Sequence, residues 1–519
     1  MNPHPTSLCA HDASRFPGAL SAIIVGLFFG ACFVVPTLSG ALGTYLLGFG
    51  SCAVIYYGLK VKYHGNIPFN AEVTLIAGIC IQYLAAPALL RLVSNDFAFF
   101  LDQPITAERM EVKEAYCDAL LIVLGFVAAY LAASSVFGVK RLPREASGKL
   151  ILSFSESSLW FVCLLAIVLW GARVALLKTG SYYHLNRSDF QFDDWRYSML
   201  AQIDSILGVL VLGYLFSRYL SMKGAALWPV AIYLGADLLW NFASGSRERG
   251  LTVVIVLVLT FILCRNRFPL KFVVPVFIGS LFLIGFMDFY RYASLSSADA
   301  SKIEVKGIHS DLTFAKSEAN ANGFMTTAIW GLARLSDLES IAGIARWVPH
   351  GIEHTKGETY LSIASGLVPR AFWHDKPPLI IPLNNWIYVN EGGSSPITIM
   401  GEGYLNFGWA GVLVSGLICG ILVPLTEGFL LKRSTRTLFF AFYLWFLIDL
   451  ARLHTQCAGV WVSILVKTIL FFFSSSAFVR LFESREPLNS SSANSKPEYT
   501  GKIKQTEIPL ETVNGISNA

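Results

Sequence analysis

Residues 368–378 read VPRAFWHDKPP and place four ionisable side chains between prolines, namely Arg370, His374, Asp375 and Lys376. The rest of the chain is poor in such groups, because 54% of its residues are hydrophobic and only 14% are charged. Guanidinium and ammonium groups bind phosphate oxygens, and an imidazole exchanges protons near neutral pH. The segment therefore predicts a polar site that holds an anionic substrate beside a candidate base.

Apolar runs near twenty residues long recur along the chain, and the mean hydropathy is +0.55. Runs of this length match the hydrocarbon core of a bilayer. We therefore expect an all-α, polytopic transmembrane protein of about twelve spans rather than a soluble enzyme. The expected spans cover residues 18–35, 40–58, 71–93, 117–137, 151–177, 199–218, 226–242, 251–264, 272–290, 410–430, 437–456 and 460–480.

The nine cysteines are scattered mostly through these apolar runs. Their positions indicate neither a disulfide framework nor a thiolate metal site. We expect no metal and no other cofactor.

Positive charge divides the loops between the expected spans into two sets. One set carries a group of lysines and arginines: Lys60, Lys62, Lys140, Arg141, Arg144, Lys149, Arg218, Lys223, Arg265, Arg267, Lys271, Lys432, Arg433 and Arg436. The positive-inside rule assigns these loops to the cytoplasm. Both termini then face the cytoplasm, and the polar tail of residues 482–519 is expected to be disordered.

One outward loop, residues 291–408, is far longer than the others and separates the first nine spans (1–290) from the last three (409–481). A loop of that length is usually functional. Apolar residues recur in it at helical spacing, at Ile329, Leu332, Leu335, Leu338, Ile341 and Ile344. We expect short helices here that lie against the membrane or the outer helix ends, with a purely structural lid as the alternative.

Many cations stand where the orientation rule disfavours them. They are Arg91, Arg173, Arg247, Arg249, Arg291 and Arg452 near the expected outer helix ends, and Arg334, Arg346, Arg370 and Lys376 in the large loop. The acids Asp204, Asp237, Asp288 and Asp449 fall at the same level. For one arginine alone, pairing with an acid or extension to the headgroups explains its position. The whole set favours a polar outer cavity for an anion, and a lipid diphosphate is the natural anion at this depth.

Aromatic residues are interspersed among the polar residues of the loop, at Trp330, Trp347, Tyr360, Trp373, Trp386, Tyr388, Tyr404 and Trp409. Such rings suit sugar surfaces and membrane interfaces alike. Trp373 lies inside the polar segment, so we expect it to contact a glycan.

Three segments together resemble the Wzy-type O-antigen and oligosaccharide repeat-unit polymerases. They are NFASGSRERG (241–250), GETYLSIASGLVPRAFWHDKP (357–377) and GEGYLNFGWAG (401–411). The resemblance covers the helix count and these motifs, and each motif alone is weakly specific. It implies a glycosyltransferase at the outer face of a bacterial inner membrane, which moves a growing glycan from undecaprenyl diphosphate onto the next lipid-linked repeat unit. A chain-length regulator in the membrane is implied in the same way.

The resemblance assigns Arg247 and Arg370 to the diphosphate. Arg291 and Lys376 are further candidates, because the departing diphosphate needs charge stabilisation. A base beside the acceptor hydroxyl is also needed, and we consider His354, His374 and Glu402 as catalytic candidates, with His350, Glu358 and Asp375 as others in the same loop. Glu402 is favoured because Gly401 and Gly403 flank it and leave room for close approach.

Residues 350–354 read HGIEH and match a zinc-peptidase signature, H-x-x-E-H. That chemistry needs the motif on a helix. Pro349 precedes the motif and Gly351 interrupts it, which favours a turn and argues against zinc.

Three other functions stay open at this point. A ligase that moves glycan to another acceptor would share the donor, whereas a flippase or other transporter of lipid-linked sugars would need charge nearer the cytoplasm or the midplane. A membrane protein without chemistry is the fourth interpretation. Expected partners are an undecaprenyl-diphosphate-linked oligosaccharide and the lipid bilayer, with no nucleic acid.

Overall fold

The computed structural model is all-helical over the residues that it describes, which confirms the all-α expectation. These residues are 41–63, 67–93, 115–137, 152, 156–178, 195–222, 227–243, 247–265, 270–296, 305–335, 338–361, 363, 368, 373, 397–431, 437–453, 457–459, 461–462, 466, 469–470 and 473. No strand occurs among them.

Every expected span from 40–58 to 437–456 coincides with helical structure. The helices are α2 (Ala41–Lys62), α3 (Ala71–Ile79) with a π-helical turn (Cys80–Ala85) and α4 (Ala86–Val93), α6 (Tyr116–Ser134), α7 (Glu156–Lys178), α9 (Trp195–Ser221), α10 (Trp228–Ala243), α11 (Arg247–Arg265), α12 (Leu270–Ser296), α17 (Ile399–Leu431) and α18 (Thr437–Leu453). The expected span 18–35 and most of 460–480 lie outside the described residues.

Two of the described helical runs, Ala71–Leu90 and Ile399–Leu431, are long and apolar enough to cross a membrane by length and composition. Shorter apolar helical runs lie in α6, α7, α9, α11, α12 and α18. The described helices are therefore compatible with membrane association.

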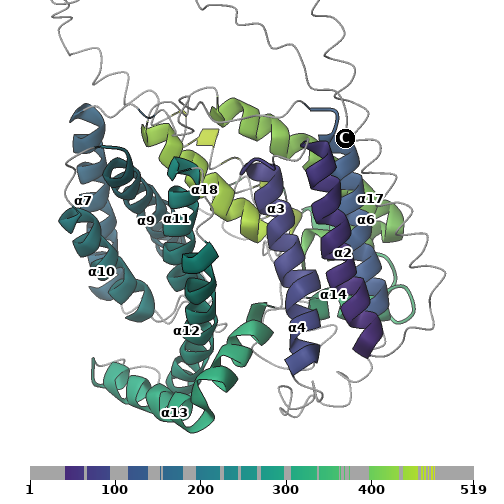
Figure 1. Ribbon diagram of the computed structural model, residues 1–519, viewed down its shortest axis with the longest axis horizontal. Helices are drawn as coiled ribbons and strands as arrows, with labels where there is room; N and C mark the ends of the chain where they lie inside the picture. Colours follow the sequence, from purple (N-terminus) through teal and green to yellow (C-terminus); the bar gives the residue numbers. More distant parts are fainter. Residues whose placement is uncertain are drawn as a thin grey trace, which may run out of the picture.

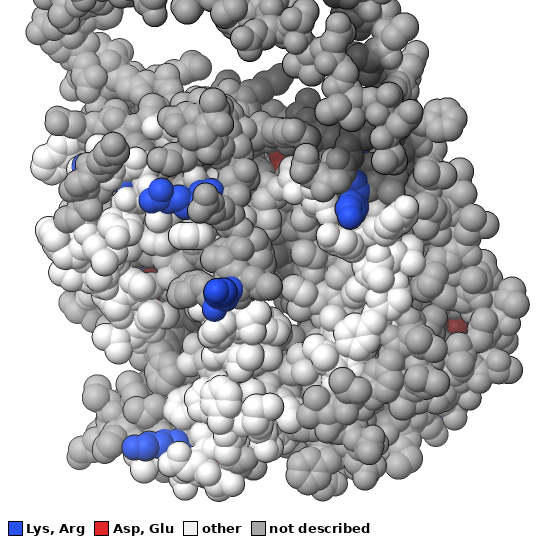
Figure 2. Space-filling model, viewed as in Figure 1, with Lys and Arg blue, Asp and Glu red and all other residues white. Residues whose placement is uncertain are grey.

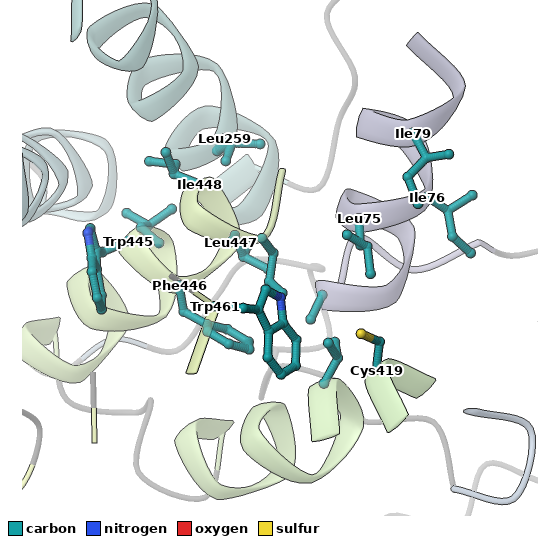
Figure 3. Close-up of a cluster of buried hydrophobic side chains, with 14 of the residues drawn as sticks. Leu75, Ile76, Ile79, Leu259, Cys419, Trp445, Phe446, Leu447, Ile448 and Trp461 are labelled. Atoms are coloured by element: carbon teal, nitrogen blue, oxygen red, sulfur yellow. The ribbon is translucent and has the colours of Figure 1, made fainter. Parts of the chain in front are cut away.

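Helix α18 lies in the middle of the bundle. Figure 1 shows α7, α9, α10 and α11 on one side of it and α2, α3, α4 and α6 on the other. Its side chains from Phe439 to Ile448 are all buried, which is expected of a helix that is apolar all round. Figure 3 shows Leu447 and Ile448 of α18 in one cluster with Leu75 of α3 and Leu259 of α11, so this cluster joins the two sides.

The large loop is helical where its sequence predicts helices. Helix α13 (Val305–Leu335) bends at Gly323, where φ is +77°, and runs along the lower end of the bundle in Figure 1. Helix α14 (Leu338–Trp347) buries Leu338, Ile341 and Ile344 completely and packs on α6 and α17. The apolar stripe of α14 therefore lies against the helix ends, one of the two expected locations.

Helix α17 is a hairpin of two helical pieces. Phe407 and Gly408 leave the helical conformation, and Gly408 has φ +60°, a value that favours glycine. The chain reverses there, so that the backbones of Gly403 and Gly411 touch: a Cβ on Gly403 would lie 2.7 Å from the Gly411 carbonyl oxygen. The longer piece, 409–431, agrees with the expected span 410–430, and residues 399–406 fold back against it.

A buried polar cluster joins the ends of five helices. Lys62 Nζ (α2) donates to Glu72 Oε1 (α3) at 2.6 Å and to Ser134 Oγ (α6) at 2.9 Å. Glu427 Oε1 (α17) accepts from the Tyr443 hydroxyl (α18) at 2.7 Å and from the amide of Ala71 at 2.8 Å. Lys62, Ser134 and Glu427 lie near the ends of α2, α6 and α17, whereas Glu72 and Tyr443 lie in the first halves of α3 and α18. These helices therefore alternate in direction, as the expected order of spans requires.

Helices α6 and α17 cross at van der Waals contact because Gly416 and Gly420 have no side chains. A Cβ on Gly416 would lie 2.6 Å from the Phe126 carbonyl oxygen, and one on Gly420 would lie 2.5 Å from that of Tyr130. Pairs of small residues four apart let helix backbones approach this closely in membranes.

Gly416→Ala should therefore destabilise the protein, by about 2 kcal/mol if the cost is that of overpacking a core. Gly171→Ala is the matched control: a Cβ added at Gly171 on α7 would meet no neighbouring atom within 4 Å, and alanine favours a helix by about 1 kcal/mol over glycine. Thermal unfolding in detergent measures both changes. Equal melting temperatures for the two variants would contradict the close crossing.

Candidate functional site

The segment Thr355–Tyr360 is attached to the hairpin of α17 by backbone hydrogen bonds. The amide of Thr355 donates to the Leu405 carbonyl at 3.1 Å, and that of Lys356 donates to the Asn406 carbonyl at 3.3 Å. Lys356 has φ +52° and Gly357 φ +99°, so the chain turns sharply before the short 3-10 helix Glu358–Tyr360. The amide of Gly357 also donates to Asn406 Oδ1 at 2.8 Å, so two of the three resembling segments, 357–377 and 401–411, meet in the structure.

Asn406 fixes this junction with its side-chain amide, which is fully buried. Its Oδ1 accepts from the Thr355 hydroxyl at 2.7 Å and from the amide of Gly357 at 2.8 Å. Its Nδ2 donates to Thr359 Oγ1 at 2.5 Å and to the Glu402 carbonyl at 2.8 Å. The amide thereby makes four hydrogen bonds, the full capacity of its two donors and two lone pairs.

His354 lies half-buried at the edge of the same junction. Its Nδ1 is 3.3 Å from the Leu405 carbonyl oxygen, and its ring meets the Tyr404 ring edge-on at 6.2 Å. The other ring nitrogen, Nε2, faces Gly408, where a Cβ would lie 3.5 Å away. His354 is thus the predicted base that the structure places beside the hairpin turn.

Glu402 lies in the same junction and is 1% exposed. Its Oε2 accepts from the amide of Ala458 at 2.5 Å, and its Oε1 has no hydrogen-bond partner. Burial raises the pKa of this carboxyl, while the Ala458 amide and the nearby Thr359 hydroxyl, which does not reach hydrogen-bonding geometry, act in the opposite direction. The carboxyl belongs to residues 399–406, outside the 409–431 piece of α17.

The room that Gly401 and Gly403 were expected to leave beside Glu402 is filled by the protein itself. A Cβ on Gly401 would lie 2.5 Å from Ile344 Cδ1, and the space at Gly403 is taken by Gly411. A substrate therefore has no access to Glu402 through these glycines. The catalytic role of Glu402 stays a prediction. In the structure its carboxylate is buried and holds the backbone amide of Ala458.

Aromatic rings surround the junction. Tyr360 lies 6.2 Å from Phe407, and Tyr404 lies 6.1 Å from Trp409, measured between ring centroids. Burial raises the pKa of the Tyr360 hydroxyl, which is 3.5 Å from Ser415 Oγ. Phe407, Trp409 and the predicted glycan contact Trp373 keep 49%, 39% and 39% of their surface exposed.

The predicted cationic ligands are only partly described. Arg247 is the first residue of α11 and Arg291 lies near the end of α12, and the description of both stops at the backbone. Arg370, His374 and Lys376 lie outside the described residues.

Arg173 is paired with two of the acids at its level. Its Nε donates to Asp204 Oδ1 at 2.8 Å and its Nη2 donates to Asp237 Oδ1, which ties α7 to α9 and α10. Arg173 is 1% exposed, and its guanidinium carbon lies 4.7 and 5.2 Å from the ring centres of Trp170 and Trp240. For this arginine the pairing interpretation is right, so we remove it from the set that would bind a diphosphate.

A cavity of about 20 Å³ adjoins this ion-pair cluster and is lined in part by Asn241 and Thr252. It has room for about one water molecule. A sugar does not fit there.

The HGIEH motif does not lie on a helix. Helix α14 ends at Trp347, and residues 348–352 form turns and a bend. His350 and Glu353 are exposed, and no group of three metal-binding side chains occurs in the described part of the chain. The expected turn is confirmed.

Comparison with known proteins gives one match. Residues 190–430 match DUF8712, a domain of unknown function. This range begins just before α9 and ends with α17, so it contains both sides of the His354–Asn406 junction. Comparisons with curated proteins and with solved structures found no match.

Within the DUF8712 range, the residues that build the junction are mostly amides and hydroxyls. Asn406 lies in GEGYLNFGWAG and Thr359 in GETYLS, so both belong to segments that resemble the polymerases. Reasoning from ionisable groups does not select them, because asparagine and threonine carry no charge. The signal available in the sequence was an asparagine between glycines, in GEGYLNFGWAG.

Glu402→Gln should change how stability depends on pH. The folded state holds the Glu402 proton more tightly than the unfolded chain, so this contribution is complete below the ordinary pKa of 4.5 and is lost as the pH rises through the folded-state pKa. The melting temperature of Glu402→Gln should therefore rise relative to that of wild type as the pH increases from mildly acidic to alkaline.

Glu353→Gln is the control, because it removes an exposed carboxylate in the adjoining segment. If the difference in melting temperature between wild type and Glu402→Gln stays constant over this pH range, the result would contradict a destabilising ionisation at Glu402.

Proposed function

We propose that the chain is a multi-pass membrane protein with about twelve spans. The surface of α17 supports this proposal. Its exposed face is apolar over Leu413, Val414, Leu417, Ile418, Ile421 and Leu425, while Ser415, Gly416, Gly420 and Glu427 on its other face are covered. A helix with apolar residues outside and small or polar residues inside suits lipid better than water.

The distribution of charge agrees with lipid around the bundle. Figure 2 shows isolated Lys and Arg side chains on a described surface that is otherwise mainly uncharged. Lys60, Arg218 and Arg265 end α2, α9 and α11. The exposed Trp160 and Trp228 lie near the starts of α7 and α10. The Lys62–Glu72 cluster indicates that the helices alternate in direction, and this alternation brings both tryptophans to the level of the basic residues. A band of basic and aromatic residues marks a cytoplasmic interface.

Glu427 lies near the end of the 409–431 piece, at the level assigned to the cytoplasmic interface. The His354–Asn406 junction lies at the start of the same piece and therefore at the opposite end of the bundle. We therefore propose that both termini face the cytoplasm and that the loop of residues 291–408 faces the periplasm. The inner membrane of a bacterium is the location that fits this orientation and the resemblance.

The function that we propose is a glycosyltransferase that polymerises lipid-linked oligosaccharide repeat units. The observation that carries it is the contact between two polymerase-like segments, in which the Asn406 side chain accepts from the amide of Gly357 and donates to the Thr359 hydroxyl. The resemblance was found in segments separated by more than twenty residues of chain. Their contact in the fold forms one site at the end of a candidate span, where an imidazole and several aromatic rings gather.

The reaction would proceed by displacement at the anomeric carbon of the growing glycan. The acceptor hydroxyl oxygen forms the new bond to that carbon, its proton goes to a base, and the bond to the diphosphate breaks with its electron pair on undecaprenyl diphosphate. We assign the base to His354, whose Nε2 faces the side-chain-free position at Gly408. His374 and Glu402 stay as predicted alternatives.

Charge on the leaving diphosphate needs cationic donors. Arg370 and Lys376 follow the junction in the loop, and Arg247 and Arg291 stand at helix ends that the orientation places outside. Trp373 offers an exposed ring to the glycan. These assignments are proposals that rest on the resemblance and on residue chemistry.

A ligase would use the same donor and differ only in the acceptor. A flippase needs a polar route across the bilayer, and the polar clusters argue against one: Arg173 is neutralised by Asp204 and Asp237, beside a cavity of about 20 Å³. The proposal therefore keeps polymerase first and ligase second. A membrane chain-length regulator is a proposed partner, and the chemistry requires no cofactor.

A strain without this protein tests the proposal. It should carry single repeat units on its surface lipid, and wild-type protein should restore the ladder of long chains on a gel. His354→Gln and Arg370→Ala should fail to restore it while reaching the membrane in normal amounts. Complementation by His350→Gln, the same change at an exposed neighbouring histidine, is expected to succeed.

Long chains that accumulate on their lipid carrier in the deletion strain would identify a ligase instead. An unchanged glycan profile would overturn both functions.

A further inference from the structure

We propose that Asn406 is a positioning residue, which fixes the tautomer and orientation of His354 so that Nε2 is left as the proton acceptor. The catalytic part of this inference rests on the proposed function. The hydrogen-bonding part does not, because it follows from the geometry of the junction alone.

The tautomer is set by the Leu405 carbonyl. A carbonyl oxygen only accepts hydrogen bonds, so the His354 Nδ1 at 3.3 Å must carry the proton. In the neutral ring, Nε2 then bears the lone pair. The same carbonyl oxygen also accepts from the amide of Thr355 at 3.1 Å, the residue that follows His354. One carbonyl therefore holds both the ring and the backbone beside it.

Asn406 holds that carbonyl in place from the next residue. The Asn406 side chain is bonded to the backbone of Gly357, to the hydroxyls of Thr355 and Thr359 and to the Glu402 carbonyl. These partners lie on both sides of the junction, in Thr355–Thr359 and in the first piece of α17. Any rotation of the Leu405–Asn406 peptide would break several of these bonds, and water cannot replace them at the Asn406 side chain because it is fully buried.

Only an amide satisfies this set of partners. Oδ1 meets two donors, while Nδ2 meets a carbonyl that cannot donate and a hydroxyl. Asn406→Asp keeps the size of the side chain and replaces the two N–H donors by an acceptor. The new oxygen then faces the Glu402 carbonyl, so the peptide is expected to shift and to release His354 Nδ1.

Nitrogen NMR of purified protein labelled with ¹⁵N-histidine reads the tautomer directly, and His354→Gln assigns the signal. We expect wild type to show His354 protonated at Nδ1, and Asn406→Asp to show a mixture with the Nε2-protonated form. Tyr360→Phe is the control, because it alters the same junction without touching His354 or Asn406. A wild-type ring protonated at Nε2, or an Asn406→Asp ring like that of wild type, would overturn the inference.

A milder pair of variants covers the case in which Asn406→Asp does not fold. Thr355→Val removes one hydroxyl donor to Oδ1, and Thr355→Ser retains it. We expect a partial shift toward the Nε2-protonated form in the valine variant and none in the serine variant. The same tautomer in both variants as in wild type would overturn the inference.

Kinetics of glycan extension test the catalytic part. Asn406→Asp should lower kcat by about tenfold to a hundredfold, which is less than the roughly hundredfold to ten-thousandfold contribution of a general base because part of the His354 population keeps the wild-type tautomer. KM for the lipid-linked acceptor should stay unchanged. A shifted tautomer with unchanged kcat would overturn the positioning role. Absence of extension by wild type, together with the expected tautomers, would overturn the proposed function and leave the hydrogen-bond assignment standing.

Discussion

The reversal of the chain at Phe407 and Gly408 is the feature on which the candidate site depends. It folds residues 399–406 back along α17, and it is possible because Gly403 and Gly411 let two backbones touch. The reversal presents the Leu405 and Asn406 carbonyls to Thr355 and Lys356, and through them the large loop is attached to the helix bundle. A straight α17 would offer no unpaired carbonyl at this point, since helical carbonyls are used within the helix.

Two other polar clusters brace the bundle, and each contains an ion pair between buried side chains. The Lys62–Glu72–Ser134 contacts join the ends of α2, α3 and α6, and the Arg173 ion pairs join α7, α9 and α10. Buried charges of this kind hold helices in a fixed arrangement, at the cost of removing them from water. The junction at His354 differs because it keeps an imidazole nitrogen at an edge, beside a glycine and half-exposed aromatic rings. This difference directs the functional proposal to the junction.

Helix positions were predictable because apolar length is encoded locally, and the expected spans from 40–58 to 437–456 match helices in the described residues. The turn at HGIEH followed from Pro349 and Gly351 in the same way. The site was predictable only in part. His354 and the two resembling segments were identified, but the flanking glycines of Glu402 were interpreted as space for a substrate, whereas Ile344 and Gly411 occupy it. The sequence also placed Asp204 and Asp237 at the level of Arg173 and allowed their pairing, but it did not select these two acids or the role of Asn406. Hydrogen bonds between residues 31 to 64 positions apart, such as those of Arg173 with Asp204 and Asp237, depend on how helices pack.

The most direct measurement is glycan extension by the purified protein in liposomes that contain a defined undecaprenyl-diphosphate-linked repeat unit. The account predicts products whose masses increase by whole repeat units, with one undecaprenyl diphosphate released for each new linkage. Recovery of the repeat unit unchanged, or its transfer solely to an acceptor other than a second lipid-linked unit, would contradict the central claim.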